Sequence, residues 1–123
     1  MRKENIEVIN NILQLLLTIE EGLEHIKIQL EELRYEEALG LLEDSILGTD
    51  SIKNAIEPMK QELEEDNIVE LGTVLEKNIS KTISSYEDGR ETNLEKQLEE
   101  GILPAFKNWK HELDKVLKPY IIS

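Results

Sequence analysis

The sequence predicts an all-α protein: an antiparallel, up-and-down four-helix bundle with kinked second and fourth helices, forming one domain over residues 1–123. Two observations support this fold class. Apolar residues recur at steps of three and four over four segments, which places them on one stripe of each helix. The connections between these segments are short, which forces consecutive helices to run antiparallel. The first stripe consists of Ile6, Ile9, Leu13, Leu16, Ile19, Leu23, Ile26, Leu30 and Leu33.

The first predicted helix begins at Lys3 or Glu4 and ends near Leu33. Gly22 lies within it, where glycine costs about 1 kcal/mol relative to alanine. We expect Gly22 to mark the close approach of a neighbouring helix, and a functional kink is the alternative.

The second predicted helix begins at Tyr35 and ends near Leu63. Its apolar stripe drifts at residues 48–50, so the alternatives are one bent helix, which we favour, and two separate helices. Thr49 falls on the buried stripe, where its hydroxyl can bond to a carbonyl one turn earlier. Pro58 lacks a backbone donor and is expected to kink the helix.

The third predicted helix runs from Ile68 to Tyr86 and is diluted by polar residues. Asp66 or Asn67 is expected to cap its beginning. Gly89 follows its end, in a position that favours the left-handed conformation of a helix C-cap.

The fourth predicted helix begins around Thr92 and extends towards Tyr120. Pro104 is expected to bend or loosen it, and Pro119 to stop or bend it. The tail from Tyr120 to Ser123 is apolar and must pack on the bundle or on another molecule.

The formal charge is −13, with 27 acidic and 14 basic side chains. Such a surface repels nucleic-acid backbones and anionic membranes, so neither is an expected partner. The sequence contains no cysteine. No signal-peptide core and no run of about 18 apolar residues is present, which favours a cytoplasmic protein.

The charges are unevenly distributed along the chain. Residues 20–66 contain 15 acidic and 4 basic side chains, whereas residues 101–123 contain 2 acidic and 4 basic ones. This bias suits packing within one molecule, and it suits head-to-tail association equally well.

No reactive constellation is found. A carboxylate-bridged di-iron site needs Glu-x-x-His, but Gly22 precedes His25 and Asn108 precedes His111 at the required spacing. Glu21 and His25 share a helix face and could bind a stray divalent ion, although a surface histidine is the preferred interpretation. The sequence also lacks nucleophile elbows and phosphate-binding loops. We therefore expect no enzymatic activity, no metal and no cofactor.

The predicted partner-binding residues lie near the C-terminus. Leu103, Phe106 and Trp109 follow one another at steps of three, which widens the apolar stripe beyond a single bundle seam. The extra width is either core or the wall of a groove for a partner helix. With the tail they make up the candidate set Leu103, Phe106, Trp109, Tyr120, Ile121 and Ile122.

Two segments resemble a family of small acidic helical proteins from Gram-positive bacteria whose function is uncharacterised. Residues 94–104, with Trp109 after them, look like the last helix of that family, and residues 38–52 are similar to its second helix. The resemblance implies a bundle, an intracellular setting and no known reaction. A looser similarity, in size and helical pattern, is to flagellar export chaperones.

These observations favour a non-enzymatic module that binds another protein or a second copy of itself, as an adaptor or a chaperone-like bundle. The alternative is a small-molecule or lipid carrier, with a core cavity where Pro58 and Pro104 bend the helices. A metal-dependent enzyme using His25 is a third hypothesis.

Overall fold

The computed structural model describes residues 1–63 and 67–121, and every regular element within them is helical. There are four long helical segments, as predicted. The first three are α1 (Lys3–Glu31), α2 (Tyr35–Ile56) and α3 (Ile68–Glu87). The fourth consists of α4 (Leu94–Gln97), a π-helical turn (Leu98–Ile102) and α5 (Leu103–Leu117). Short 3₁₀ helices lie at Glu57–Met59, Glu91–Asn93 and Lys118–Tyr120.

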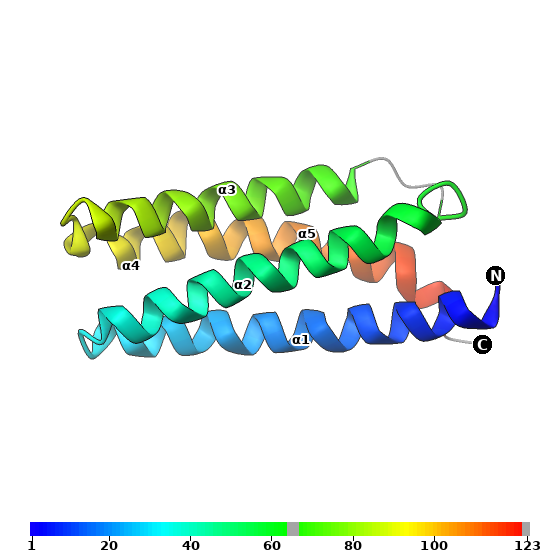
Figure 1. The fold of residues 1–123 in the computed structure, drawn as a ribbon, viewed down its shortest axis with the longest axis horizontal. Helices are drawn as coiled ribbons and strands as arrows, with labels where there is room; N and C mark the ends of the chain where they lie inside the picture. The colour runs from blue at the N-terminus through cyan, green and yellow to red at the C-terminus, as the bar shows by residue number, and fades with distance from the viewer. Residues whose placement is uncertain (64–66, 122–123) are drawn as a thin grey trace.

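Figure 1 shows α1 and α3 running one way along the bundle and α2, α4 and α5 running the other way. The beginning of α1 and the end of α5 therefore lie at the same end of the molecule. Glu62 joins them there: its carboxylate lies 3.8 Å from the amino group of Met1, and its carbonyl accepts a hydrogen bond of 3.3 Å from the hydroxyl of Tyr120.

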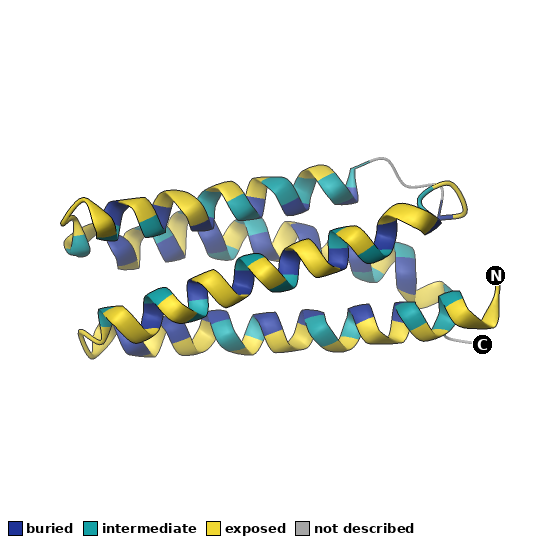
Figure 2. Ribbon diagram, viewed as in Figure 1, coloured by how far each residue is buried: buried dark blue, intermediate teal, exposed yellow. Residues whose placement is uncertain are grey.

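The core is a single cluster of mainly aliphatic side chains from all four segments. Figure 2 shows that the buried residues of each helix lie on the side that faces the other helices. The largest fully buried side chain is Trp109, and the ring of Phe106 meets it edge-on with centroids 6.4 Å apart. Burial of this kind stabilises the fold by about 1.5–3 kcal/mol for each large apolar side chain, before chain entropy is subtracted.

The α1 helix ends at Glu31 and not at Leu33, because Leu33 adopts the left-handed conformation with φ of 60°. The N–H of Arg34 then bonds to the carbonyl of Gln29 at 2.8 Å, which closes a Schellman motif. Neither glycine nor proline announces this turn, so its exact position had no strong sequence signal.

The end of α3 uses the same motif with the residue that the sequence predicted. Gly89 has φ of 79°, and the N–H of Arg90 bonds to the carbonyl of Ser85 at 2.8 Å. The left-handed glycine is therefore confirmed. Asp66, one of the two predicted caps at the other end of α3, lies outside the described residues.

The α2 helix is continuous through residues 48–50, so the favoured alternative of one helix is confirmed there. The hydroxyl of Thr49 donates to the carbonyl of Ser45 at 2.8 Å, again as predicted. The predicted end at Leu63 is wrong, because α2 ends at Ile56. Pro58 lies in the following 3₁₀ helix, since proline cannot donate the hydrogen bond that would continue an α-helix.

The fourth segment departs from α-helical geometry just before Pro104. Because Pro104 has no N–H, the carbonyl of Glu100 cannot receive the usual bond from it. The chain forms a π-helical turn instead, in which the N–H of Leu103 bonds to the carbonyl of Leu98. At the other end, α5 ends at Leu117, two residues before Pro119.

The glycines correct one further expectation. A Cβ at Gly22 would meet nothing within 4 Å, so Gly22 does not mark a close helix approach. Close approaches occur at Gly48, where a Cβ would lie 3.0 Å from the Cδ1 of Ile19, and at Gly72, where it would lie 3.1 Å from the Nε1 of Trp109.

Candidate functional site

The predicted partner-binding residues of α5 are divided between core and surface. Phe106 and Trp109 are only 2% and 0% exposed, so their side chains form core, which was one of the two alternatives for this stripe. Leu103 is half-buried and lines, with Phe106 and residues of α1, a pocket of about 220 Å³. Partner binding by these residues stays a prediction, but two of them are not accessible in this conformation.

The tail packs on its own bundle as far as the structure describes it. Tyr120 and Ile121 are half-buried against the core. Ile122, the last residue of the predicted set, lies outside the described residues.

A more accessible apolar surface lies between α1 and α2, and we call it the α1–α2 groove. Two adjoining pockets of about 300 and 150 Å³ form it, and both are lined by Leu15. The lining residues from α1 include Val8, Asn11, Leu15, Thr18 and Gly22. Those from α2 include Leu41, Asp44, Gly48, Ser51 and Ala55.

The groove follows a regular pattern in the sequence. On both helices the lining residues recur at alternating steps of three and four, which is the spacing of a coiled-coil seam. Each helix therefore has a second stripe beside its core stripe. Small residues dominate the second stripe of α2, and at Gly48 the backbone comes close to Ile19. Sequence reasoning missed this stripe because small and polar residues interrupt it, although the spacing was available as a signal.

The one charged residue among the described residues that line the groove is acidic, Asp44. Around all faces of α2 the exposed charged residues are also acidic: Glu36, Glu37, Glu43, Asp44 and Asp50. Leu47 stands among them with 65% of its surface exposed. The only base of α2, Lys53, turns towards α3 and is already engaged there.

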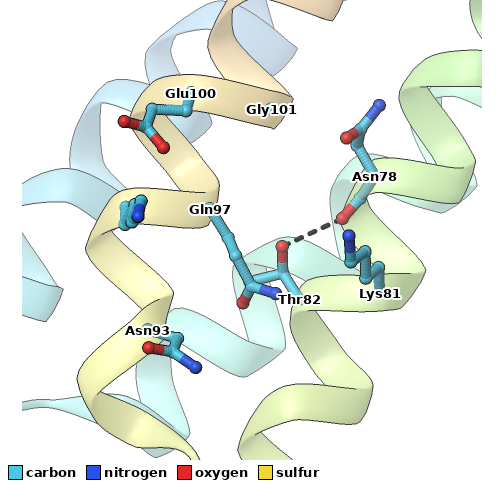
Figure 3. Close-up of a pocket in the computed structure, with 8 residues that line it drawn as sticks. Asn78, Lys81, Thr82, Asn93, Gln97, Glu100 and Gly101 are labelled. Carbon is cyan, nitrogen blue, oxygen red and sulfur yellow. Dashed lines mark hydrogen bonds between the residues drawn. The ribbon is translucent and has the colours of Figure 1, made fainter.

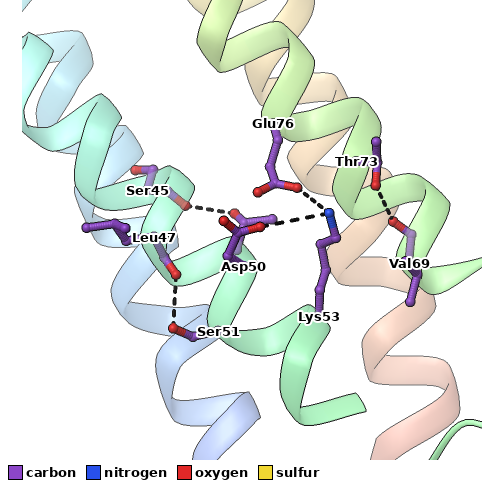
Figure 4. Close-up of polar contacts among 9 residues, drawn as sticks. Ser45, Leu47, Asp50, Ser51, Lys53, Val69, Thr73 and Glu76 are labelled. Atoms are coloured by element: carbon purple, nitrogen blue, oxygen red, sulfur yellow. Dashed lines mark hydrogen bonds and ion pairs between the residues drawn. The ribbon is translucent and has the colours of Figure 1, made fainter. Parts of the chain in front are cut away.

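Lys53 lies between two carboxylates, as Figure 4 shows. Its Nζ pairs with Glu76 of α3 and lies 3.9 Å from Asp50 one turn earlier on α2. Burial raises the pKa of Glu76, a hydrogen bond with Asp50 raises it further, and Lys53 opposes both effects. The net upward direction means that this environment favours the neutral form of Glu76.

A further pocket of about 450 Å³, lined by polar residues and a glycine, lies between α3 and the fourth segment (Figure 3). We call it the polar pocket. Its lining residues are Asn78, Lys81, Thr82, Asn93, Lys96, Gln97, Glu100 and Gly101. No large apolar side chain is among them, which distinguishes it from the α1–α2 groove.

Gly101 and Asn78 lie close together in the wall of the polar pocket. A Cβ at Gly101 would lie 2.7 Å from the Oδ1 of Asn78, so a side chain at this position would displace that amide. The Nε2 of Gln97 donates to the hydroxyl of Ser85 at 2.9 Å. Among the described residues, nothing donates to its Oε1 atom, although this atom is buried.

His25 and His111 are both exposed, and neither lines the α1–α2 groove or the polar pocket. Within residues 1–63 and 67–121, no three acidic or histidine side chains cluster as metal ligands would. No helix in the same residues combines the length and hydropathy that crossing a bilayer requires.

Comparison with known proteins gives one match. A family model described as a domain of unknown function, DUF8042, matches residues 7–112. Neither the curated proteins nor the solved structures contain a match. The family match agrees with the expected family of uncharacterised function. Because the matched region covers most of the 123 residues, this chain belongs to the DUF8042 family.

Proposed function

We propose that this chain is a non-enzymatic, adaptor-like or chaperone-like module that binds another protein. In this proposal it is an antiparallel, up-and-down bundle, with a bend in the fourth segment where Pro104 interrupts the helical hydrogen bonds. In this proposal the protein is cytoplasmic, as its lack of a signal-peptide core favours, and the sequence resemblance suggests a Gram-positive bacterium as its source.

The observation that supports binding is the α1–α2 groove. Its two stripes have the spacing that receives a third helix, and half-buried Val8, Leu15 and Leu41 offer apolar contacts. Helix-in-groove recognition uses anchors at this spacing on the incoming helix. A helical segment is therefore the occupant whose shape matches the groove.

The charge of the groove defines that occupant further. Because the exposed charges of α2 are all acidic, an incoming acidic helix would be repelled and a basic one attracted. The exposed Leu47 adds an apolar contact beside the groove. The proposed partner is a basic amphipathic helix of another protein.

The test uses a synthetic, fluorescein-labelled peptide of about 18 residues, with leucine on one helical face and lysine on the others. Fluorescence anisotropy measures its affinity at several salt concentrations. A peptide of identical composition, with its leucines spread over all faces, is the control for charge alone. We expect the amphipathic peptide to bind at least about tenfold more tightly.

Two matched protein variants locate the binding. Gly22→Arg fills the groove without a clash, because a Cβ there meets nothing within 4 Å. Ser80→Arg adds the same charge on an exposed position of α3. We expect only the first variant to lose affinity for the peptide. Equal affinity of both variants would refute the α1–α2 groove as the binding site.

Self-association is distinguished by sedimentation velocity. A dimer that Gly22→Arg abolishes would show a second copy in the groove, and would overturn the proposed heterologous partner. The core-cavity carrier remains the alternative, and a ligand that copurifies in native mass spectrometry would favour it.

A further inference from the structure

The polar pocket is independent of the α1–α2 groove, because it lies between α3 and the fourth segment. Its volume of about 450 Å³ falls within the range of about 300–1,000 Å³ that is typical of small-molecule sites. Its polar lining suits a hydrophilic ligand and not a lipid or an aromatic one.

The charges in the pocket define the ligand's sign. Lys81 and Lys96 reach it from opposite walls, on α3 and α4. Among the described residues, Lys27, Lys53, Lys110 and Lys118 pair with carboxylates, whereas several other lysines, including Lys3 and Lys115, have no ion pair there. Within the described residues, Lys81 and Lys96 form no ion pair, so two cations remain available to an anion.

An acceptor in the pocket defines a second property of the ligand. Glu100 is exposed and lines the same pocket (Figure 3). A ligand that also carries hydroxyl groups could donate to its carboxylate, whereas a bare inorganic anion could not.

The backbone supports the same interpretation. Gln97 comes directly before the π-helical turn, and Glu100 and Gly101 lie within it. Such turns frequently occur at functional sites. We propose that the polar pocket binds a small polyhydroxylated organic anion, either a phosphate ester or a carboxylate, held by Lys81 and Lys96 and by the carboxylate oxygens of Glu100.

The experiment titrates the full chain with ribose 5-phosphate, gluconate and uncharged ribose, followed by ¹H–¹⁵N NMR. We expect saturable shifts at residues of the pocket with at least one anion and not with ribose, and the tighter anion identifies the acidic group. The double variant Lys81→Gln, Lys96→Gln is expected to weaken binding at least about tenfold. The control Lys3→Gln, Lys115→Gln removes the same charge at exposed positions outside the pocket and is expected to bind normally.

Three results would overturn the proposal: no saturable shift with either anion, binding of ribose as tight as that of the anions, or equal weakening by the two double variants. None of these results depends on whether the α1–α2 groove binds a helix. The groove variant Gly22→Arg is expected to bind the anion normally.

Discussion

The indole nitrogen of Trp109 packs directly against Gly72, so that a Cβ on this glycine would lie only 3.1 Å from it. The contact joins α5 to α3 at the centre of the bundle, where Trp109 is 0% exposed. The same Cβ would lie 3.1 Å from the Cδ of Lys53 of α2. One residue without a side chain therefore allows three helices to meet.

This contact predicts that Gly72→Ala lowers the free energy of unfolding by about 1 kcal/mol. Lys53 can move aside, but Trp109 cannot without opening the core, and overpacking costs about 1–3 kcal/mol. That cost exceeds the gain in helix propensity of up to about 1 kcal/mol. Urea unfolding measures the change. Gly22→Ala is the control and is expected to stabilise the protein, since its Cβ meets nothing; equal stabilisation by both variants would contradict the prediction.

The Schellman motifs at the ends of α1 and α3 each need one left-handed residue, Leu33 and Gly89. We predict that Leu33→Gly stabilises the protein and that Gly89→Ala destabilises it. Leu33 has φ of 60° and is 68% exposed, so Leu33→Gly relieves backbone strain while losing little burial. Gly89 has φ of 79°, so Gly89→Ala introduces the same strain. We expect a gain and a loss of about 1 kcal/mol respectively, because left-handed geometry costs a residue with a Cβ about 1–2 kcal/mol. Thermal unfolding followed by circular dichroism tests both, and a destabilised Leu33→Gly protein would argue against strain at that turn.

The raised pKa of Glu76 predicts a specific pH dependence. Its folded-state pKa lies above the ordinary value of a glutamate, so the folded state binds the proton more tightly than the unfolded state. The contribution of Glu76 to the free energy of unfolding is therefore fully present below its unfolded-state pKa. It is lost as the pH rises through the folded-state pKa.

Glu76→Gln removes this dependence while keeping the shape of the side chain. We expect the stability of the variant relative to the natural protein to increase from pH 4 towards pH 7, as measured by urea unfolding at each pH. Glu70→Gln, on an exposed position of the same helix, controls for the change in net charge. A relative stability that falls with pH would show that the pairing with Lys53 dominates.

We predict that the ion pair between Lys110 and Glu20 contributes measurably to the free energy of unfolding, whereas a more exposed pair contributes little. The Nζ of Lys110 lies 3.1 Å from both carboxylate oxygens of Glu20, and the two side chains are 29% and 34% exposed. Lys27 and Glu99 are 3.5 Å apart with exposures of 50% and 53%. Double-mutant cycles are expected to give about 0.5–1 kcal/mol for the first pair and less for the second. The first value is expected to shrink in 1 M salt, and equal coupling energies would contradict this ranking.

Much of the fold could be predicted because helical periodicity is local. The stripe of α1, the buried Thr49 with its bond to Ser45, and the left-handed Gly89 all follow from residues within one or two turns of each other. The predicted helix ends were less accurate. The turn after α1 has its left-handed residue at Leu33, without any glycine or proline signal. The sequence predicts a kink at Pro58, but this residue lies beyond the end of α2.

The candidate sites could not be predicted in the same way, because they depend on which helices become neighbours. The predicted anchors Phe106 and Trp109 are buried because α5 packs against both α1 and α3. The α1–α2 groove needs two second stripes to lie side by side, and the polar pocket needs α3 to face a π-helical turn.

By itself, the sequence determined an all-helical protein with four long segments and an aliphatic core, since the spacing of leucine and isoleucine along a helix decides which face is buried. Only the tertiary structure decided which glycines allow close contact, which aromatic residues are hidden, and where surface remains open. Those features depend on distances between residues far apart in the chain, such as Gly72 and Trp109. Local periodicity contains no information on such distances.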